Sequence, residues 1–207
     1  MTITNGYCTL AEFKAEKRVT STDATDDGVI EGLIEDASRL IDAITGRHFY
    51  AMTTMTRVYD VPPDGVVWLD EDLLVLTTLT NGDGTAISSA NYVLRPDNRL
   101  PKFLIQLRDV SGLGFYPSST TGSEQQAISI LGTWGYCDRA SSDADSITAV
   151  RNTRQACIEI AVHNYQQRFG QVTEGNVQVT AAGLVITPHG AIPKAAYERI
   201  RPYIKAV

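Results

Sequence analysis

The feature that most constrains the fold is a change in hydrophobic periodicity along the chain. Between Val29 and Ile44, apolar residues recur every three or four positions, the spacing of a helix with one buried stripe. Over residues 55–136 the apolar period falls to about two, and helical spacing returns between Ile147 and Phe169. The chain is therefore predicted to be an α+β protein in which a β-region separates two long helices.

Local signals predict where the helices begin and end. Thr9-Leu-Ala-Glu12 has the form of a capping box, which predicts a short helix over residues 10–17. Asp23, Asp26 and Asp27 crowd the first turn of the first long helix and Gly46 follows its end, so this helix is expected over residues 24–45. Pro193 is typical of a first helical turn and predicts a short C-terminal helix over residues 194–201.

The β-region contains short segments rich in β-branched and aromatic residues, separated by turn signals. We expect an antiparallel lobe of five or six strands, at Thr56–Val61, Val66–Leu69, Leu73–Leu79, Asn91–Leu94, Phe103–Arg108 and Ala127–Thr133. Further along, Asn176–Thr180 and Leu184–Thr187 predict a β-hairpin with Gly183 at its turn. Asp138–Ser146 is expected to be a polar linker.

These elements divide the chain into three parts. Residues 1–54 are expected to form the N-terminal helical part of the core, and residues 55–136 an inserted β-lobe. Residues 137–207 then supply the second long helix, the hairpin and a terminal segment. The first and third parts are predicted to make one helical core, because packing the two apolar stripes together buries both.

Composition and charge exclude some functional classes. The chain of 207 residues has no apolar run near the roughly 18 residues of a membrane span. Its first residues, Met1 to Cys8, lack the basic and apolar segments of a secretory signal, so none is expected. A net charge of −6 argues against a protein that grips nucleic acid by its phosphates. Residues 1–150 carry 11 basic and 21 acidic side chains, whereas residues 151–207 carry 7 and 3. An acidic body with a basic end suits self-association or docking, although two merely solvated faces would look the same.

No pattern in the sequence recruits a metal, a phosphate or a nucleophile, so we expect no enzyme, no cofactor and no metal. His163 and Glu159 lie one helical turn apart, which favours a surface pair over half a metal site. Asn81-Gly-Asp-Gly84 is interpreted as a hairpin turn rather than a calcium loop. Asp70-Glu-Asp72 is expected to be a solvated turn between two strands.

Three cysteines, Cys8, Cys137 and Cys157, are far apart in the sequence and form no CxxC pair. They predict three buried or half-buried free thiols in a reducing compartment, in a protein made in a cytoplasm.

Four sequence motifs together resemble the head–tail connector (adaptor) proteins of tailed bacteriophages. The first is Tyr7-Cys-Thr-Leu10, which begins the short helix, and the second is Thr45-Gly-Arg-His-Phe49, which ends the long one. The third is Gly132-Thr-Trp-Gly-Tyr136 at the exit of the β-lobe, and the fourth runs from Pro193 to Tyr203. The chain departs from that family in Asp138-Arg-Ala, where many members have valine-proline, and in its large β-lobe.

The resemblance implies a non-enzymatic virion protein in the neck at the head–tail interface, assembled in the host cytoplasm. Such subunits form a ring, commonly of twelve copies, between the portal and the tail. The implied partners are the portal protein, a tail-side neck protein (stopper or tail terminator), further copies of the chain, and double-stranded DNA that passes through the lumen without specific binding. No membrane is implied. Alternatives are a stopper, tail-completion or head-decoration protein, or a ligand-binding module.

The basic end of the chain supplies a hypothesis for docking on the portal or on a neighbouring subunit. Its candidate residues combine positive charge with aromatic anchors: Lys194, Tyr197, Arg199, Arg201, Tyr203 and Lys205. A lumen lined by carboxylates would let DNA slide, and the 176–187 hairpin is expected to become ordered on contact with a partner.

Overall fold

The computed structural model describes residues 3–18, 20, 22–109, 112–137, 150–169, 176–180, 183–187 and 192–205, with backbone alone in 176–180 and 183–187. The predicted α+β class is confirmed. The chain divides into two compact units, a helical unit (Met1–Arg47 with Ala149–Val207) and a β-lobe (His48–Thr148). The predicted linker 138–146 lies outside the described residues, as do the flanks of the hairpin at 170–175 and 188–190.

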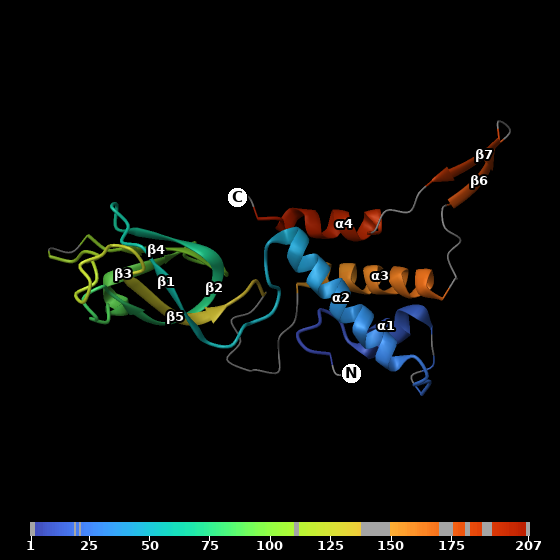
Figure 1. Ribbon diagram of the computed structural model, residues 1–207, viewed down its shortest axis with the longest axis horizontal. Helices are drawn as coiled ribbons and strands as arrows, with labels where there is room; N and C mark the ends of the chain where they lie inside the picture. Colours follow the sequence, from blue (N-terminus) through green and yellow to red (C-terminus); the bar gives the residue numbers. More distant parts are fainter. Residues whose placement is uncertain are drawn as a thin grey trace. The chain divides into compact units, whose positions relative to one another are not determined.

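The helical unit is organised around α3, which contacts α1, α2 and α4 (Figure 1). Its elements are α1 (Leu10–Lys17), α2 (Asp27–Thr45), α3 (Arg151–Arg168), the antiparallel strands β6 (Asn176–Thr180) and β7 (Gly183–Thr187), α4 (Lys194–Ile200) and the 3₁₀ turn η2 (Arg201–Tyr203). The predicted hairpin strands are thus present, with Gly183 inside β7. Large side chains at the centre of this unit are fully buried: Phe13, Ile34, Ile41, Ile160 and Ile200.

The capping box predicted before α1 forms, and α1 has its predicted bounds. The Thr9 hydroxyl accepts a hydrogen bond from the Glu12 amide (3.2 Å), and the Glu12 carboxylate accepts from the Thr9 amide (2.8 Å). The first long helix begins at Asp27, three residues later than predicted. Asp23 accepts from the amide of Thr25 (3.1 Å) and so holds this stretch in turns. Gly46 ends α2 in the left-handed conformation (φ +64°).

A buried ammonium group ties α1 to the start of α2. Lys14 is 5% exposed, and its Nζ lies 2.5 Å from an Asp27 carboxylate oxygen. The same group donates to the carbonyl of Asp23 (2.6 Å). A charge taken out of water needs partners of this kind, so the contact fixes the angle between the two helices.

The β-lobe is a five-stranded antiparallel sheet in the order β1-β5-β2-β4-β3 (Figure 1). Its elements are β1 (Met55–Tyr59), β2 (Val66–Thr80), the 3₁₀ turn η1 (Ser89–Asn91), β3 (Tyr92–Arg95), β4 (Lys102–Leu107) and β5 (Ile128–Trp134).

The prediction of two strands joined by a turn at Asp70–Asp72 is wrong, because residues 66–80 form one strand. Register shifts between Trp68 and Leu73, and again between Leu73 and Thr78, mark irregularities within it. Such irregularities bend a strand without ending it. β2 therefore pairs with β4 over its first half and with β5 over its second.

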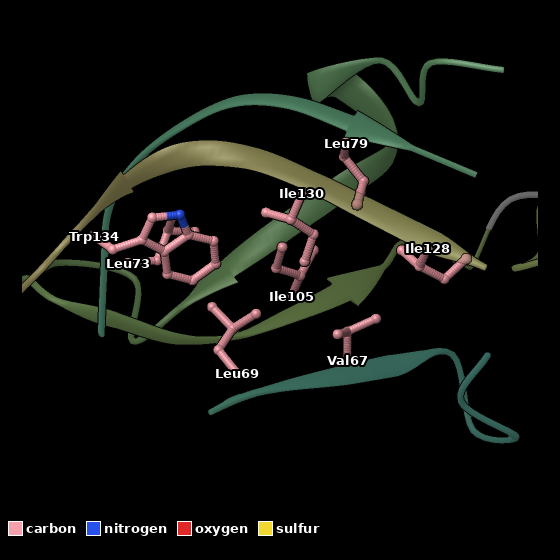
Figure 2. Packing of buried hydrophobic residues seen from close by; sticks show 8 residues of the cluster. All are labelled: Val67, Leu69, Leu73, Leu79, Ile105, Ile128, Ile130 and Trp134. Atoms are coloured by element: carbon pink, nitrogen blue, oxygen red, sulfur yellow. The ribbon is translucent and has the colours of Figure 1, made fainter. Parts of the chain in front are cut away.

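One face of the sheet carries the core of the lobe (Figure 2). The buried residues of this cluster are Val67, Leu69, Leu73, Leu79, Ile105, Ile128, Ile130 and Trp134. Trp134 is fully buried, and its indole N–H donates to the carbonyl of Met55 (3.1 Å), so its single polar atom is satisfied.

The glycines around Trp134 are required by close backbone approach. A Cβ at Gly132 would lie 2.5 Å from the carbonyl oxygen of Val75. Gly135 has φ +138°, and a Cβ there would lie 2.0 Å from the carbonyl oxygen of Tyr50. The third motif of the family resemblance, Gly132 to Tyr136, therefore serves the packing of the lobe.

Candidate functional site

The C-terminal segment, the predicted docking region, is anchored on the helical unit. Ala196 and Ile200 of α4 are fully buried, and α4 packs on α3. Beyond the helix, the Arg47 guanidinium donates to the carbonyl of Tyr203 (2.8 Å), and the amide of Lys205 donates to the carbonyl of Thr45 (2.8 Å). The segment is thus part of the folded unit and holds a fixed position on it.

The six predicted docking residues do not share one environment. Arg199 donates from Nε to a carboxylate oxygen of Glu159 on α3 (3.0 Å), so its charge is engaged within the unit. The Tyr203 hydroxyl accepts from the side-chain amide of Asn152 (3.3 Å). Arg199, Tyr203 and Lys205 therefore hold the C-terminal segment on the rest of the helical unit.

The other three predicted residues, Lys194, Tyr197 and Arg201, are exposed. Their positions are three and four residues apart, so they project from one side of α4 and the start of η2, where Arg201 pairs with Glu198 (3.7 Å). The exposed Ile204 follows and was not singled out from the sequence. We call Lys194, Tyr197, Arg201 and Ile204 the C-terminal face; an aromatic ring and an aliphatic chain beside two cations are suited to protein contact.

The helical unit is electrically polarised along the sequence. Residues 1–47 carry 5 basic and 9 acidic side chains, a net −4, whereas residues 149–207 carry 7 and 3, a net +4. The C-terminal face thus belongs to the more basic of the two sequence segments that make up the unit. Opposite charges on different parts of one molecule favour head-to-tail association between copies.

A second exposed surface lies on the β-lobe and was not predicted. Trp68 of β2 is 65% exposed and Phe103 of β4 is 40% exposed. Their rings stack with centroids 6.5 Å apart and planes 16° apart. The sequence hints at the exposure of Trp68 through the alternation of side chains along β2. Trp68 stands between the buried residues Val67 and Leu69 and therefore points to the opposite face of the strand. We call Trp68 and Phe103 the aromatic pair.

The carboxylates at 70–72 lie inside β2, where neighbouring side chains engage them. Asp70 accepts a hydrogen bond from the Tyr59 hydroxyl, and Glu71 pairs with Arg57 (3.1 Å). Burial, followed by that hydrogen bond to Asp70, raises the pKa of Tyr59 well above its usual range. These contacts tie β1 to the part of β2 around its register shift, which is a structural use of the cluster.

The other candidate ligands also have structural contacts. Glu159 pairs with Arg199 as above, and His163 is hydrogen-bonded to Gln167 (3.0 Å). In the Asn81–Gly84 turn, the Asn81 side chain donates to the carbonyl of Gly114 (2.9 Å) and accepts from the amide of Tyr116 (2.8 Å). Among the residues that the structure describes, no group of three or more His, Cys, Asp or Glu could hold a metal ion.

These features define a two-unit α+β protein with one basic and one aromatic exposed surface. No described helix is long and apolar enough to cross a bilayer. No protein-family model matches the sequence, and no curated protein matches it.

Among solved structures, the fold is similar to that of a chain in the neck of an empty GTA particle, a phage-like gene transfer agent, computed with C6 symmetry. The likeness has a TM-score of 0.59 at 15% identity and covers 100% of this chain and 94% of that chain. The predicted resemblance to head–tail connectors is thereby confirmed at the level of fold.

Proposed function

We propose that this chain is a non-enzymatic structural protein of a tailed phage or phage-like particle, one subunit of a ring in the neck between portal and tail. The observation that carries the proposal is the fold likeness to a neck chain, because it extends over the whole of this chain and nearly all of the other.

The polarity of the helical unit suits assembly into a ring. Every interface in a head-to-tail ring joins two different surfaces, and these must be complementary. A segment of net −4 and a segment of net +4 within one unit supply that complementarity. We propose a ring of twelve copies, a number compatible with the C6 symmetry used for the similar neck.

The two exposed surfaces supply contacts to other components. The C-terminal face docks on the portal or on the neighbouring subunit, and the aromatic pair serves the tail-side neck protein, a stopper or tail terminator. Aromatic side chains and arginine are enriched in protein interfaces.

DNA is proposed to pass through the ring without being held. A protein that grips the duplex needs clustered cations to release counterions from phosphates, and this chain carries a net charge of −6. Salt-sensitive binding of duplex DNA by the assembled ring would contradict this part of the proposal.

The experiment is to measure the mass and symmetry of the purified protein, alone and mixed with its portal protein, by native mass spectrometry and negative-stain imaging. We expect a ring of about twelve copies, alone or on the portal. A monomer or dimer that ignores the portal would overturn the proposal, and a capsid-wide copy number would favour a head-decoration protein.

Charge-reversal variants locate the docking surface. Lys194→Glu with Arg201→Glu is expected to reduce ring or portal assembly at least tenfold, since both side chains are exposed. Arg99→Glu with Arg108→Glu makes the same change in net charge at exposed positions of the lobe and is the control. Equal loss in both variants would assign the effect to total charge rather than to the C-terminal face.

A further inference from the structure

All three cysteines are buried, as predicted, and two of them are neighbours in space. Cys8 precedes α1, and Cys157 lies in the middle of α3, 149 positions away in the sequence. Their Sγ atoms are 3.5 Å apart. Two thiols in contact inside a core can form a disulfide without unfolding of the chain. A single buried thiol has no such neighbour and can form a disulfide only after the chain opens.

We propose that Cys8 and Cys157 are a covalent modification site, at which hydrogen peroxide joins them in an intrachain disulfide that ties the N-terminal segment to α3. The chemistry does not depend on the proposed ring, so the two proposals fail independently.

The geometry requires little movement. A disulfide has a sulfur–sulfur distance of about 2.05 Å, so the two sulfurs must approach by about 1.5 Å. Cys8 lies outside regular secondary structure, where a small backbone adjustment is possible. The surroundings of Cys157 are also polar enough for reaction, since its sulfur lies 3.4 Å from the Ser38 hydroxyl.

Hydrogen bonds assign different roles to the two thiols. The contact with Cys8 lowers the pKa of Cys157, against the opposing effect of burial. The Ser38 hydroxyl and the backbone amides of Tyr7 and Cys8 act in the same direction. The same contact, with burial, raises the pKa of Cys8. The opposite directions of these two shifts favour Cys157 as the nucleophile, with Cys8 keeping its proton until the second step.

The reaction balances with peroxide as the oxidant. The Cys157 thiolate attacks one oxygen of hydrogen peroxide, the O–O bond breaks, and the departing hydroxide takes a proton to become water. Cys157 is then a sulfenic acid. The Cys8 sulfur attacks the Cys157 sulfur, the S–O bond breaks, and the hydroxide leaves with the Cys8 proton as a second water. Two thiols are oxidised, and one peroxide is reduced to two waters.

Burial selects small reagents. Cys8 is 4% exposed and Cys157 is fully buried. The segment above them is held on α2, where the Tyr7 amide donates to the Ser38 hydroxyl (3.0 Å) and Arg39 donates to the carbonyl of Asn5 (3.0 Å). A molecule little larger than water can enter such a core through small fluctuations, whereas alkylating reagents must wait for the segment to open.

The test treats the full-length protein with hydrogen peroxide, blocks remaining thiols with iodoacetamide in denaturant, and maps tryptic peptides by mass spectrometry. The expected product joins residues 1–14 to residues 155–168 with the loss of two hydrogens. Closing so long a loop should also raise the melting temperature of the helical signal at 222 nm by about 5–10 °C. Complete alkylation of both cysteines after peroxide treatment would overturn the proposal, as would a link through Cys137 instead.

Variants separate the pair from general oxidation. In Cys8→Ser the second step is lost, so Cys157 should accumulate as a sulfenic acid that dimedone captures. Cys137→Ser should leave the cross-link unchanged and is the control. A rise in melting temperature that persists in Cys8→Ser would also contradict the proposed link.

Discussion

The helical unit and the β-lobe are built from the chain in opposite ways. The helical unit joins both ends of the sequence, residues 1–47 and 149–207, whereas the lobe is one continuous stretch. The contacts follow this difference: Glu12 pairs with Arg154 across 142 positions, and the Tyr165 hydroxyl bonds Asp26 across 139. The lobe instead depends on strand pairing and on turns within its own span.

The difference explains how a large β-lobe can occupy the middle of a helical protein. The two ends of the described part of the lobe lie close together, since the amide of Tyr136 donates to the carbonyl of His48 (2.6 Å). A stretch whose ends meet can be inserted without moving the elements on either side of it. The helical unit then has to be stabilised by long-range contacts, and the lobe by its own core. Four predictions test this comparison.

The largest expected effect is on the lobe. Trp134→Ala removes a fully buried side chain from its core and should lower the free energy of unfolding by about 3–5 kcal/mol. Urea denaturation followed by the fluorescence of Trp68, the remaining tryptophan, reports the lobe, and circular dichroism at 222 nm reports the helices. We expect the fluorescence transition to move far more than the helical one.

Trp68→Ala is the matched control, because it removes the same side chain from an exposed position. Its effect on stability should stay within about 0.5 kcal/mol. Equal shifts of both signals in Trp134→Ala would show that the units do not unfold separately and would break the comparison.

The second prediction concerns the N-terminal segment of the helical unit. The Tyr7 hydroxyl donates to the buried carboxylate of Asp42, so Tyr7→Phe leaves that carboxylate with one donor fewer. Loss of a hydrogen bond to a buried charged group should cost about 1–2 kcal/mol, measured by urea denaturation at 222 nm. Tyr197→Phe changes an exposed tyrosine and should leave the transition in place.

These contacts also show which features a sequence reveals. The ends of α1 were predictable because the Thr9 capping box is local. The split of β2 was wrong because Asp70 and Glu71 look like turn residues until Tyr59 and Arg57 engage them from β1. The aromatic pair was missed because alternation reveals two faces of a strand but not which apolar side chains stay uncovered. The contact of Cys8 with Cys157 was missed because no local pattern encodes a neighbour 149 positions away.

The third prediction uses alkaline pH to stress the lobe. The pKa of Tyr59 is raised, so the folded lobe keeps this proton when the unfolded chain, with a tyrosine pKa of about 10, has lost it. The stabilisation is fully present below about pH 10 and is lost as the pH rises toward the folded pKa. Denaturant midpoints between pH 9 and 11.5 should fall more steeply for wild type than for Tyr59→Phe.

Tyr116→Phe removes an exposed tyrosine of the same lobe and serves as the control. Its midpoints should decline with pH as steeply as those of wild type. If Tyr59→Phe declined just as steeply, the pKa of Tyr59 would not be raised in the folded lobe.

The smallest expected effects compare one ion pair from each unit. Arg57 pairs with Glu71 in the lobe, is about a quarter exposed, and lies over the ring of Trp134 (5.1 Å). Arg199 pairs with Glu159 in the helical unit but is 42% exposed. Arg57→Ala should cost about 1–2 kcal/mol, because a desolvated cation–π contact is lost with the ion pair. Arg199→Ala should cost at most about 1 kcal/mol, as exposed pairs do.

Salt and assembly then distinguish the two possible roles of Arg199. If the arginine mainly holds α4 on α3, then 1 M salt should abolish its small contribution to stability, because an exposed pair is screened. In that case Arg199→Ala should reduce ring or portal assembly only to the extent that it lowers the free energy of unfolding. If Arg199→Ala left stability unchanged but abolished assembly, Arg199 would belong to the docking surface together with Lys194 and Arg201. A cost larger than that of Arg57→Ala would reverse the comparison between the two units.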